Sequence, residues 1–262
     1  MRKFAFHLGI NTYSPAYYGE GVSLDKCVKD SERMMEISRA KGFDYVMHLT
    51  DDNAQAETWE AVVLKIAEQA NRGDVVFLTQ SSHGTYTTET PNGKRATGLC
   101  FHDRVVFDFE VREVLKKFRA GVLVVWAADA CYAESNWRRI IPGLTGANLF
   151  GKSRFVRVNS GLIEPTQGDK RNIRCTFLSY SAAGHMQEAY EDDRGGVFTE
   201  AIMSALGNEA GLSYYQLARR AAELIANNYP QTPVFETVRA AAYTGSPFLT
   251  NQKSLPPKKN KA

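Results

Sequence analysis

Two short motifs carry the residue types that nucleophilic acyl transfer requires. His83 lies in a Ser-Ser-His-Gly run at residues 81–84, directly after an apolar stretch, and Cys131 ends an Asp-Ala-Cys run at residues 129–131, directly after another. An imidazolium beside a thiol lowers the pKa of the thiol and can donate a proton to a leaving amine. The two residues are therefore a candidate catalytic dyad, provided that the fold brings the motifs together.

The backbone beside this pair could complete the chemistry, because the N–H groups of Gly84 and Cys131 would point at a substrate carbonyl and stabilise its oxyanion. Each motif alone also has a structural interpretation: a cysteine after an apolar strand is most often buried and inert, and a histidine at a strand end is often only hydrogen-bonded. The histidine precedes the cysteine by about fifty residues, a spacing noted for one cysteine-protease family. The two motifs taken together favour the catalytic interpretation over the structural one.

The elements that must position the motifs alternate between apolar strands and amphipathic helices. Apolar runs predict strands at 4–10, 44–49, 74–82, 122–128, 175–181 and 233–240. Apolar residues at helical spacing predict helices at 23–41 with Ser23 as N-cap, from the capping residues 50–53 to residue 70, and at 108–118, 197–206 and 213–227. A polar loop after Gly84 precedes a hairpin predicted around 99–106.

Strands that are apolar on both faces and joined by crossover helices are typical of a mainly parallel sheet covered by helices on both sides. The sequence thus predicts a three-layer α/β sandwich with six strands. Reactive groups gather at the carboxyl edge of such a sheet. If the strands that precede His83 and Cys131 are neighbours, both side chains project from that edge.

Composition and charge exclude several classes of protein. The 262 residues are 44% hydrophobic and 23% charged, which indicates a globular domain. The net charge of +3 comes from four lysines in the last ten residues, so the rest of the chain is close to neutral and no nucleic-acid surface is expected. Residues 251–262 are predicted to be a basic, disordered tail. No apolar run reaches the length of a membrane span.

Cysteine usage indicates the compartment. The four cysteines lie far apart and form no C-x-x-C pair, a pattern that favours reduced thiols in the cytoplasm over disulfides or a zinc site. The first residues lead into an apolar strand without the features of a secretion signal, which agrees with a cytoplasmic protein.

Further motifs stand in order around the two that carry the candidate dyad. They are Leu-Gly-Ile-Asn-Thr-Tyr at 8–13, an L-x-x-C-x-x-D helix start at 24–30, Leu-Thr-Asp-Asp-Asn-Ala at 49–54, Ser-Tyr-Ser-Ala at 179–182, Gln-Glu-Ala-Tyr-Glu at 187–191 and Gly-Gly-Val-Phe-Thr at 195–199. Over about residues 4–205, the chain resembles the caspase-like peptidases (family C14, clan CD), and within them the metacaspases and their bacterial relatives, the orthocaspases.

The resemblance implies a role for each matching residue. Cys131 would be the nucleophile, and His83 the general base and acid. The acidic S1 pocket of the family would map onto four residues: Asp30, Asp129, Cys27 and Ser81. Two carboxylates select a cationic P1 side chain by charge and by fork geometry, so cleavage after Arg or Lys is expected.

True caspases differ at this pocket, since they require Asp at P1 and carry Gln-Ala-Cys at the nucleophile, where this chain has Asp129 in place of Gln. Both acids also have a simpler interpretation. Without the surrounding motifs, Asp30 would be a solvent-exposed acid on a helix face, and Asp129 a cap for its own turn.

The resemblance also divides the chain into parts. Residues 1–250 would form a single peptidase domain, with a large-subunit-like part at 1–142, a connection at 143–174 and a small-subunit-like part at 175–250. The connection is long and lacks a periodic pattern. It contains Lys170, Arg171 and Arg174, where an Arg/Lys-specific enzyme could cut itself; an ordinary surface loop is the alternative.

Many metacaspases require calcium, held by clustered acids near the helix that begins around residue 107 in this chain. Asp103, Asp108 and Glu110 could contribute oxygen ligands, but the paired acids are missing. Surface acids are the preferred interpretation, and no metal or organic cofactor is expected.

The sequence therefore predicts a monomeric cytoplasmic cysteine endopeptidase that acts on proteins or peptides with a basic P1 residue, without nucleic-acid or membrane partners. One alternative is a catalytically idle interaction module of the same fold. Another is a nucleotide- or flavin-binding domain. Gly19 and Gly21 in a loop after the first strand are the only sign of it, and no G-x-G-x-x-G motif or Walker lysine is present.

Overall fold

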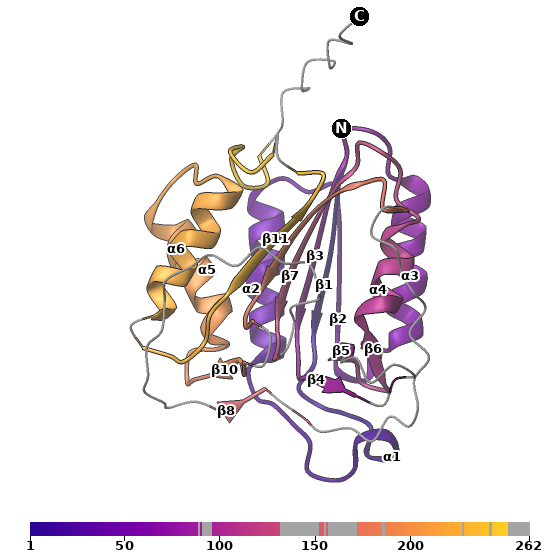
Figure 1. Ribbon diagram of the computed structural model, residues 1–262, viewed down its shortest axis with the longest axis vertical. Helices are drawn as coiled ribbons and strands as arrows, with labels where there is room; N and C mark the ends of the chain where they lie inside the picture. The colour runs from indigo at the N-terminus through magenta and orange to yellow at the C-terminus, as the bar shows by residue number, and fades with distance from the viewer. Residues whose placement is uncertain are drawn as a thin grey trace, which may run out of the picture.

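A six-stranded sheet forms the centre of the molecule (Figure 1). The computed structural model describes residues 1–88, 90, 96–131, 152–154, 156, 172–184, 187–226, 228–240 and 243–250. The sheet has the order β11-β9-β7-β3-β1-β2. Its strands are β1 (Lys3–Gly9), β2 (Tyr45–Thr50), β3 (Val75–Ser81), β7 (Leu123–Asp129), β9 (Thr176–Ser181) and β11 (Val234–Val238). Only the β9–β11 pair is antiparallel.

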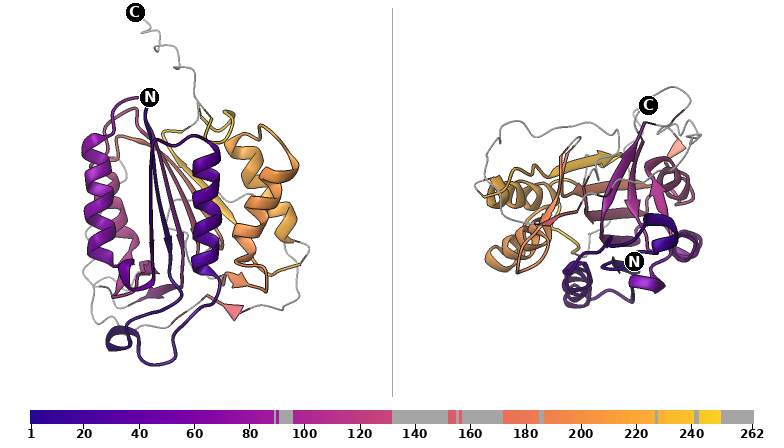
Figure 2. Two further views of the ribbon diagram at one scale, coloured as in Figure 1. Left: turned by 180° about the vertical axis from the view of Figure 1, so that it is seen from behind. Right: turned by 90° about the horizontal axis from the view of Figure 1, so that it is seen from below.

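Helices cover both faces of this sheet (Figures 1 and 2). One face carries α2 (Cys27–Ala40), α5 (Val197–Asn208) and α6 (Tyr214–Ala226), and the other carries α3 (Ala56–Gln69) and α4 (Asp108–Leu115). The predicted three-layer α/β sandwich with a mainly parallel six-stranded sheet is confirmed.

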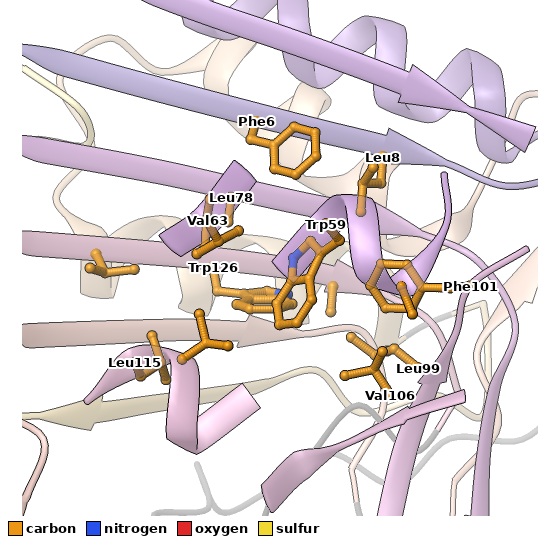
Figure 3. Packing of buried hydrophobic residues seen from close by; sticks show 14 of the residues in the cluster. Phe6, Leu8, Trp59, Val63, Leu78, Leu99, Phe101, Val106, Leu115 and Trp126 are labelled. Carbon is orange, nitrogen blue, oxygen red and sulfur yellow. The ribbon is translucent and has the colours of Figure 1, made fainter. Parts of the chain in front are cut away.

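The central strands feed two hydrophobic cores because their side chains alternate between the faces. In β3, Val76 and Leu78 pack on the α3 side, whereas Val75 and Phe77 pack on the α2 side. Trp126 of β7 stacks edge-on against Trp59 of α3 within the first core (Figure 3). This burial on both faces explains the continuous apolar runs in the sequence.

Shorter elements surround the carboxyl edge of the sheet, at the lower end in Figure 1. They are α1 (Pro15–Tyr18), the 3-10 turn η1 (Asp51–Asn53), β4 (Gly84–Thr87), β5 (Ala96–Cys100), β6 (Val105–Phe107), β8 (Lys152–Ser153) and β10 (Tyr190–Glu191). The hairpin predicted around 99–106 is confirmed as β5–β6, and β4 extends it to three antiparallel strands. The polar composition around β4 gave no strand signal.

Two predicted helix caps are wrong. Ser23 does not start α2; it forms an isolated bridge with Thr12, and the helix begins at Cys27. The Cys27 N–H is instead bonded by Asn11 Oδ1, 2.8 Å away at the end of β1. Long-range capping of this kind cannot be found from local sequence.

The start of α3 is also capped by a residue that is distant in the sequence. The Ala56 N–H donates to Asp103 Oδ1 at 2.8 Å, whereas residues 50–53, predicted to provide the cap, lead into and form the 3-10 turn η1. Within that turn, Asp51 Oδ1 accepts the N–H groups of Asn11 and Thr12. Among the described residues, none of the helices combines the length and the apolarity needed to cross a bilayer.

We expect Asn11→Ala to lower the free energy of unfolding by about 1 kcal/mol, because the substitution leaves the first N–H group of α2 without its acceptor. Urea denaturation followed by circular dichroism measures the change. Asn53→Ala is the matched control, since this exposed amide bonds only the neighbouring Asp52 carboxylate. Equal stability of the two variants would contradict a capping role for Asn11.

Candidate active site

The two motifs that contain the candidate catalytic residues lie side by side. Strands β3 and β7 pair in parallel with Ser81 opposite Asp129, as the sequence required. His83 and Cys131 each stand two residues beyond this last pair, so both leave the sheet at the same edge. The Ser82 N–H continues the contact by donating to the Asp129 carbonyl at 3.3 Å.

Close packing of Gly84 on Cys131 joins the two motifs. A Cβ atom at position 84 would overlap the carbonyl oxygen of Cys131, so only glycine allows this approach. The Gly84 N–H, one of the two predicted oxyanion donors, points at a carbonyl oxygen: it donates to the backbone oxygen of Arg154 at 2.8 Å.

The Cys131 thiol is buried beneath neighbouring backbone. Its Sγ atom accepts the Ala189 N–H at 3.0 Å and lies 4.0 Å from the Ser153 hydroxyl. Burial raises the pKa of Cys131 to about 12, and the Ala189 N–H offsets only part of that rise. In this conformation the thiol is therefore protonated at neutral pH.

His83 has a firmly held backbone. Its N–H donates to the hydroxyl of Tyr13 at 2.7 Å, and its carbonyl accepts the Cys100 N–H at 3.0 Å. The rings of His83 and Tyr13 lie 5.1 Å apart. Proton exchange between this imidazole and the Cys131 thiol stays a prediction.

The four residues assigned to the S1 pocket are all buried, and three of them lie close together. Asp30 comes from the first turn of α2, and its carboxylate accepts the Ser81 hydroxyl at 3.0 Å. Asp30 is 0% exposed, so its interpretation as a solvent-exposed acid is wrong. Cys27 is fully buried at the start of α2, and burial raises the pKa of its thiol, a rise that the nearby Arg154 cation opposes.

Among the described residues, the hydrogen-bond partner of the Asp129 carboxylate lies outside its own turn, in contrast to the other simple interpretation. Its Oδ2 atom accepts both the N–H and the hydroxyl of Thr199, at 2.9 and 2.7 Å, in the first turn of α5. Asp30 accepts the N–H of Gly196 at the same helix terminus. Both carboxylates thus face the positive end of the α5 dipole.

A guanidinium that sequence reasoning missed fills the pocket. Arg154 is fully buried, and its Nη2 atom lies 2.6 Å from Asp30 Oδ2 and 3.2 Å from Glu191 Oε2. Its Nη1 atom lies 2.7 Å from the Ser81 hydroxyl, 2.9 Å from the Asp129 carbonyl oxygen and 3.1 Å from Asp129 Oδ1.

Charge decides what this pocket can hold. Three carboxylates, those of Asp30, Asp129 and Glu191, surround one cation. Burial opposes ionisation of Arg154, yet the acids, Asp129 first among them, raise its pKa above the ordinary value. Burial also raises the pKa of Asp129, an effect that the Arg154 cation opposes. An unaccompanied carboxylate entering this space would be repelled.

Sequence reasoning identified neither Glu191 nor Arg154 as a residue of the pocket. Glu191 closes the motif at 187–191, but nothing in that motif shows that it faces the pocket. Arg154 belongs to the connection at 143–174, in which the sequence singled out Lys170, Arg171 and Arg174.

Of the three predicted self-cleavage residues, the structure describes Arg174 alone. Lys170 and Arg171 lie outside the described residues. Arg174 is exposed and lies two residues before β9, which is parallel to β7, so it stands at the opposite, amino edge of the sheet.

The candidate calcium ligands have structural partners. Asp103 accepts the Ala56 N–H, Asp108 pairs with Arg112 at 2.7 Å, and Glu110 pairs with Arg104 at 2.8 Å. A search of the described residues for three or more His, Cys, Asp or Glu side chains grouped to hold a metal ion found none.

Comparisons with known proteins bear on the family and on the fold. A family model described as "Caspase domain" matches residues 2–243. A protein of Geobacter sulfurreducens is 21% identical, with 97% of this chain and 100% of that chain covered and a TM-score of 0.80. Caspase-1 from Spodoptera frugiperda is 14% identical, with 89% and 85% covered and a TM-score of 0.57. At these identities the solved structures show the shared fold alone. No curated protein matches the sequence.

We expect Gly84→Ala to lower the free energy of unfolding by about 2 kcal/mol or more, because the new methyl group collides with the Cys131 backbone. Gly207→Ala, in α5 with open space around the new Cβ, should be neutral or stabilising. Urea denaturation of both variants measures the difference. A Gly84→Ala protein as stable as wild type would contradict the close packing of the two motifs.

Proposed function

The chain belongs to the caspase-domain peptidases, and on this premise we propose that it is a cysteine endopeptidase that cuts after Arg or Lys through Cys131 and His83. The observation that carries the proposal is the buried Arg154 guanidinium. Three carboxylates hold it, and the hydroxyl of the preceding residue, Ser153, lies 4.0 Å from the sulfur of the candidate nucleophile. A pocket that holds an internal arginine in this way suits the same side chain in a substrate.

The geometry supports a division of labour in acyl transfer. Cys131 attacks the carbonyl carbon of the P1 residue, and His83 protonates the departing amine. The Gly84 N–H stabilises the oxyanion, a role supported by its 2.8 Å hydrogen bond to a backbone carbonyl oxygen. These groups suffice for peptide hydrolysis, so the proposed mechanism uses no cofactor.

Ionisation of the nucleophile needs a change around it. The pKa of about 12 at Cys131 reflects burial under neighbouring backbone. Opening of the site to water and a neighbouring His83 imidazolium would both lower that pKa, because each stabilises the thiolate.

The pocket favours the P1 preference. An arginine can reproduce the paired contacts of Arg154 with Asp30 and with Ser81. A lysine supplies the charge without the planar fork, and should be accepted less well. An aspartate at P1 would place a fourth carboxylate among three, with no partner to compensate for its burial.

The substrates are proteins or peptides with a basic P1 residue, and the enzyme acts as a cytoplasmic monomer that processes itself within residues 143–174. All four cysteines are free, which supports a reducing compartment. A catalytically idle module is less favoured, because the pocket and both dyad residues are present together.

Cys131→Ala should reduce hydrolysis of a fluorogenic peptide with Arg at P1 by about 1,000-fold or more, because the nucleophile is removed. Cys175→Ala, a buried cysteine at the opposite edge of the sheet, should keep the activity of wild type. Initial rates of all three proteins at equal concentration provide the measurement. Residual hydrolysis by Cys131→Ala at the wild-type rate would refute the nucleophile assignment.

Asp30→Asn should lower kcat/KM for the Arg-P1 peptide by about 100-fold, because a buried charge-assisted contact is worth about 2–3 kcal/mol. Glu191→Gln, with the longer contact, should cost about 10-fold. Asp52→Asn, an exposed acid, serves as the control. Wild-type enzyme that cleaves only Asp-P1 peptides would overturn the pocket assignment.

A further inference from the structure

We propose that Thr199 is a positioning residue of the S1 pocket: it holds one oxygen of the Asp129 carboxylate, so that the other oxygen faces the P1 cation. The inference rests on the proposed function and adds a residue outside the four assigned to the pocket. Thr199 ends the Gly-Gly-Val-Phe-Thr motif at residues 195–199, to which the proposed mechanism assigns no role.

The two oxygens of the Asp129 carboxylate have different partners. Oδ2 accepts the N–H of Thr199 at 2.9 Å and its hydroxyl at 2.7 Å. Oδ1 lies 3.1 Å from the guanidinium nitrogen Nη1 of Arg154. Arg154 carries the kind of cation that a basic P1 side chain brings, so Oδ1 is the oxygen offered to a substrate. Thr199 therefore holds the carboxylate from the side that a substrate does not use.

The place of Thr199 in α5 makes it a fixed point. The side chain is 1% exposed, and the residue lies in the first turn, where N–H groups have no acceptor within the helix. Gly196 occupies the N-cap position of this helix and has no side chain that could accept one of them. Asp129 takes the part of the missing cap from the end of β7.

Gly196 allows the helix to come this close. Its φ of −64° is one that any residue adopts, so glycine is not required there for the backbone conformation. A Cβ atom at this position would overlap Asp129 Oδ2 and crowd Asp30 Oδ2. Glu191 of β10 also forms an isolated bridge with Gly196, which places the amino end of α5 at the carboxyl edge of the sheet (Figure 1).

A helix cap alone explains less of this arrangement. Capping requires an oxygen that accepts a backbone N–H of the first turn, and the Thr199 N–H satisfies that requirement. The hydroxyl of the same residue donates to the same oxygen, a contact that the helix does not need. Two donors on Oδ2 fix the rotation of the carboxylate and leave Oδ1 directed at the cation.

The charges around Asp129 make its ionisation sensitive to these donors. In the part of the chain that the structure describes, the neighbouring titratable and charged groups are Asp30 and Arg33 of α2, Arg154 after β8, Glu191 of β10 and Glu200 of α5. Arg33 and Glu200 pair with each other where α2 meets the start of α5. Arg154 is thus the cation that the acids of the pocket share.

The hydrogen bonds from Thr199 favour the charged form of Asp129. Burial raises the pKa of this carboxyl, and the carboxylate of Asp30 adds to the rise. The Arg154 cation and both hydrogen bonds from Thr199 oppose it. A protonated Asp129 attracts a P1 cation less strongly, so loss of the Thr199 hydroxyl should weaken substrate binding.

The test compares full-length Thr199→Val with wild type, each incubated until hydrolysis of the fluorogenic Arg-P1 peptide proceeds at a constant rate. Valine removes the hydroxyl and keeps the branched shape and the N–H. We expect KM to rise about 10-fold with kcat within about twofold of wild type, because a hydrogen bond to a buried charge is lost and the dyad is untouched.

Two further variants separate the hydroxyl from packing. Thr199→Ser keeps the hydroxyl, so its KM should stay within about twofold of wild type. Thr176→Val removes a buried threonine hydroxyl at the start of β9, at the opposite edge of the sheet, and should leave KM and kcat unchanged. Circular dichroism checks that each protein is folded. Should Thr199→Val not fold, Thr199→Ala takes its place with the same expectations.

The pH dependence of inhibition reports on the pocket without the dyad. Agmatine carries the guanidinium of an arginine side chain and has no bond to cleave. Its inhibition constant should rise as the pH falls, when Asp129 takes up a proton. In Thr199→Val that rise should begin about one pH unit higher than in wild type, because the pKa of Asp129 is raised further.

The results distinguish the two proposals. Thr199→Val with the KM and the agmatine profile of wild type would overturn this inference and leave the proposed function standing. A lower kcat shared by Thr199→Val and Thr199→Ser, at unchanged KM, would also overturn it, because packing and not the hydroxyl would then matter. Wild type that does not hydrolyse the Arg-P1 peptide would overturn the proposed function itself.

Discussion

The buried ion cluster around Arg154 is the interaction on which the rest of the structure depends. Three carboxylates cannot share a dry pocket without compensation, and the guanidinium supplies part of it. The amino end of α5 adds to it, because its N–H groups donate to Asp30 and Asp129. The cluster connects α2, β3, β7, β8, β10 and the start of α5. It therefore links segments that precede residue 143 with segments that follow residue 174.

The register of β3 and β7 brings the motifs that follow these two strands together. Because the strands are parallel neighbours with Ser81 opposite Asp129, equal offsets along the chain become adjacent positions in space. Gly84 then allows the loops after the two strands to touch, backbone against backbone. The distance along the chain between the two motifs is irrelevant to this geometry.

Much of this could be predicted from sequence, because periodicity and strand-end chemistry are local signals. The six sheet strands and the five longer helices follow from them. That the strands before His83 and Cys131 are neighbours was a condition of the predicted dyad, and the order of the sheet meets it. Contacts between distant segments could not be read in the same way. Asn11 caps α2 and Asp103 caps α3 across the fold, whereas the sequence pointed to nearer residues. Pairing of β8 with β10 brings Arg154 and Glu191 to the pocket. Each of these strands has two residues, which is too short for a recognisable sequence pattern.

The shortness of β10 has a consequence for target choice. Under the proposed function, a substrate that pairs with Tyr190 and Glu191 as β8 does would be bound through its main chain, so discrimination would rest on one basic residue. Arginine and lysine are abundant on protein surfaces, but most are carried by helices or folded strands whose own amide groups are already engaged. Under the proposed function, the enzyme would select an exposed, extended chain more than a particular sequence. Linkers between domains, loosened termini and partly unfolded proteins would then be cut more readily than compact proteins.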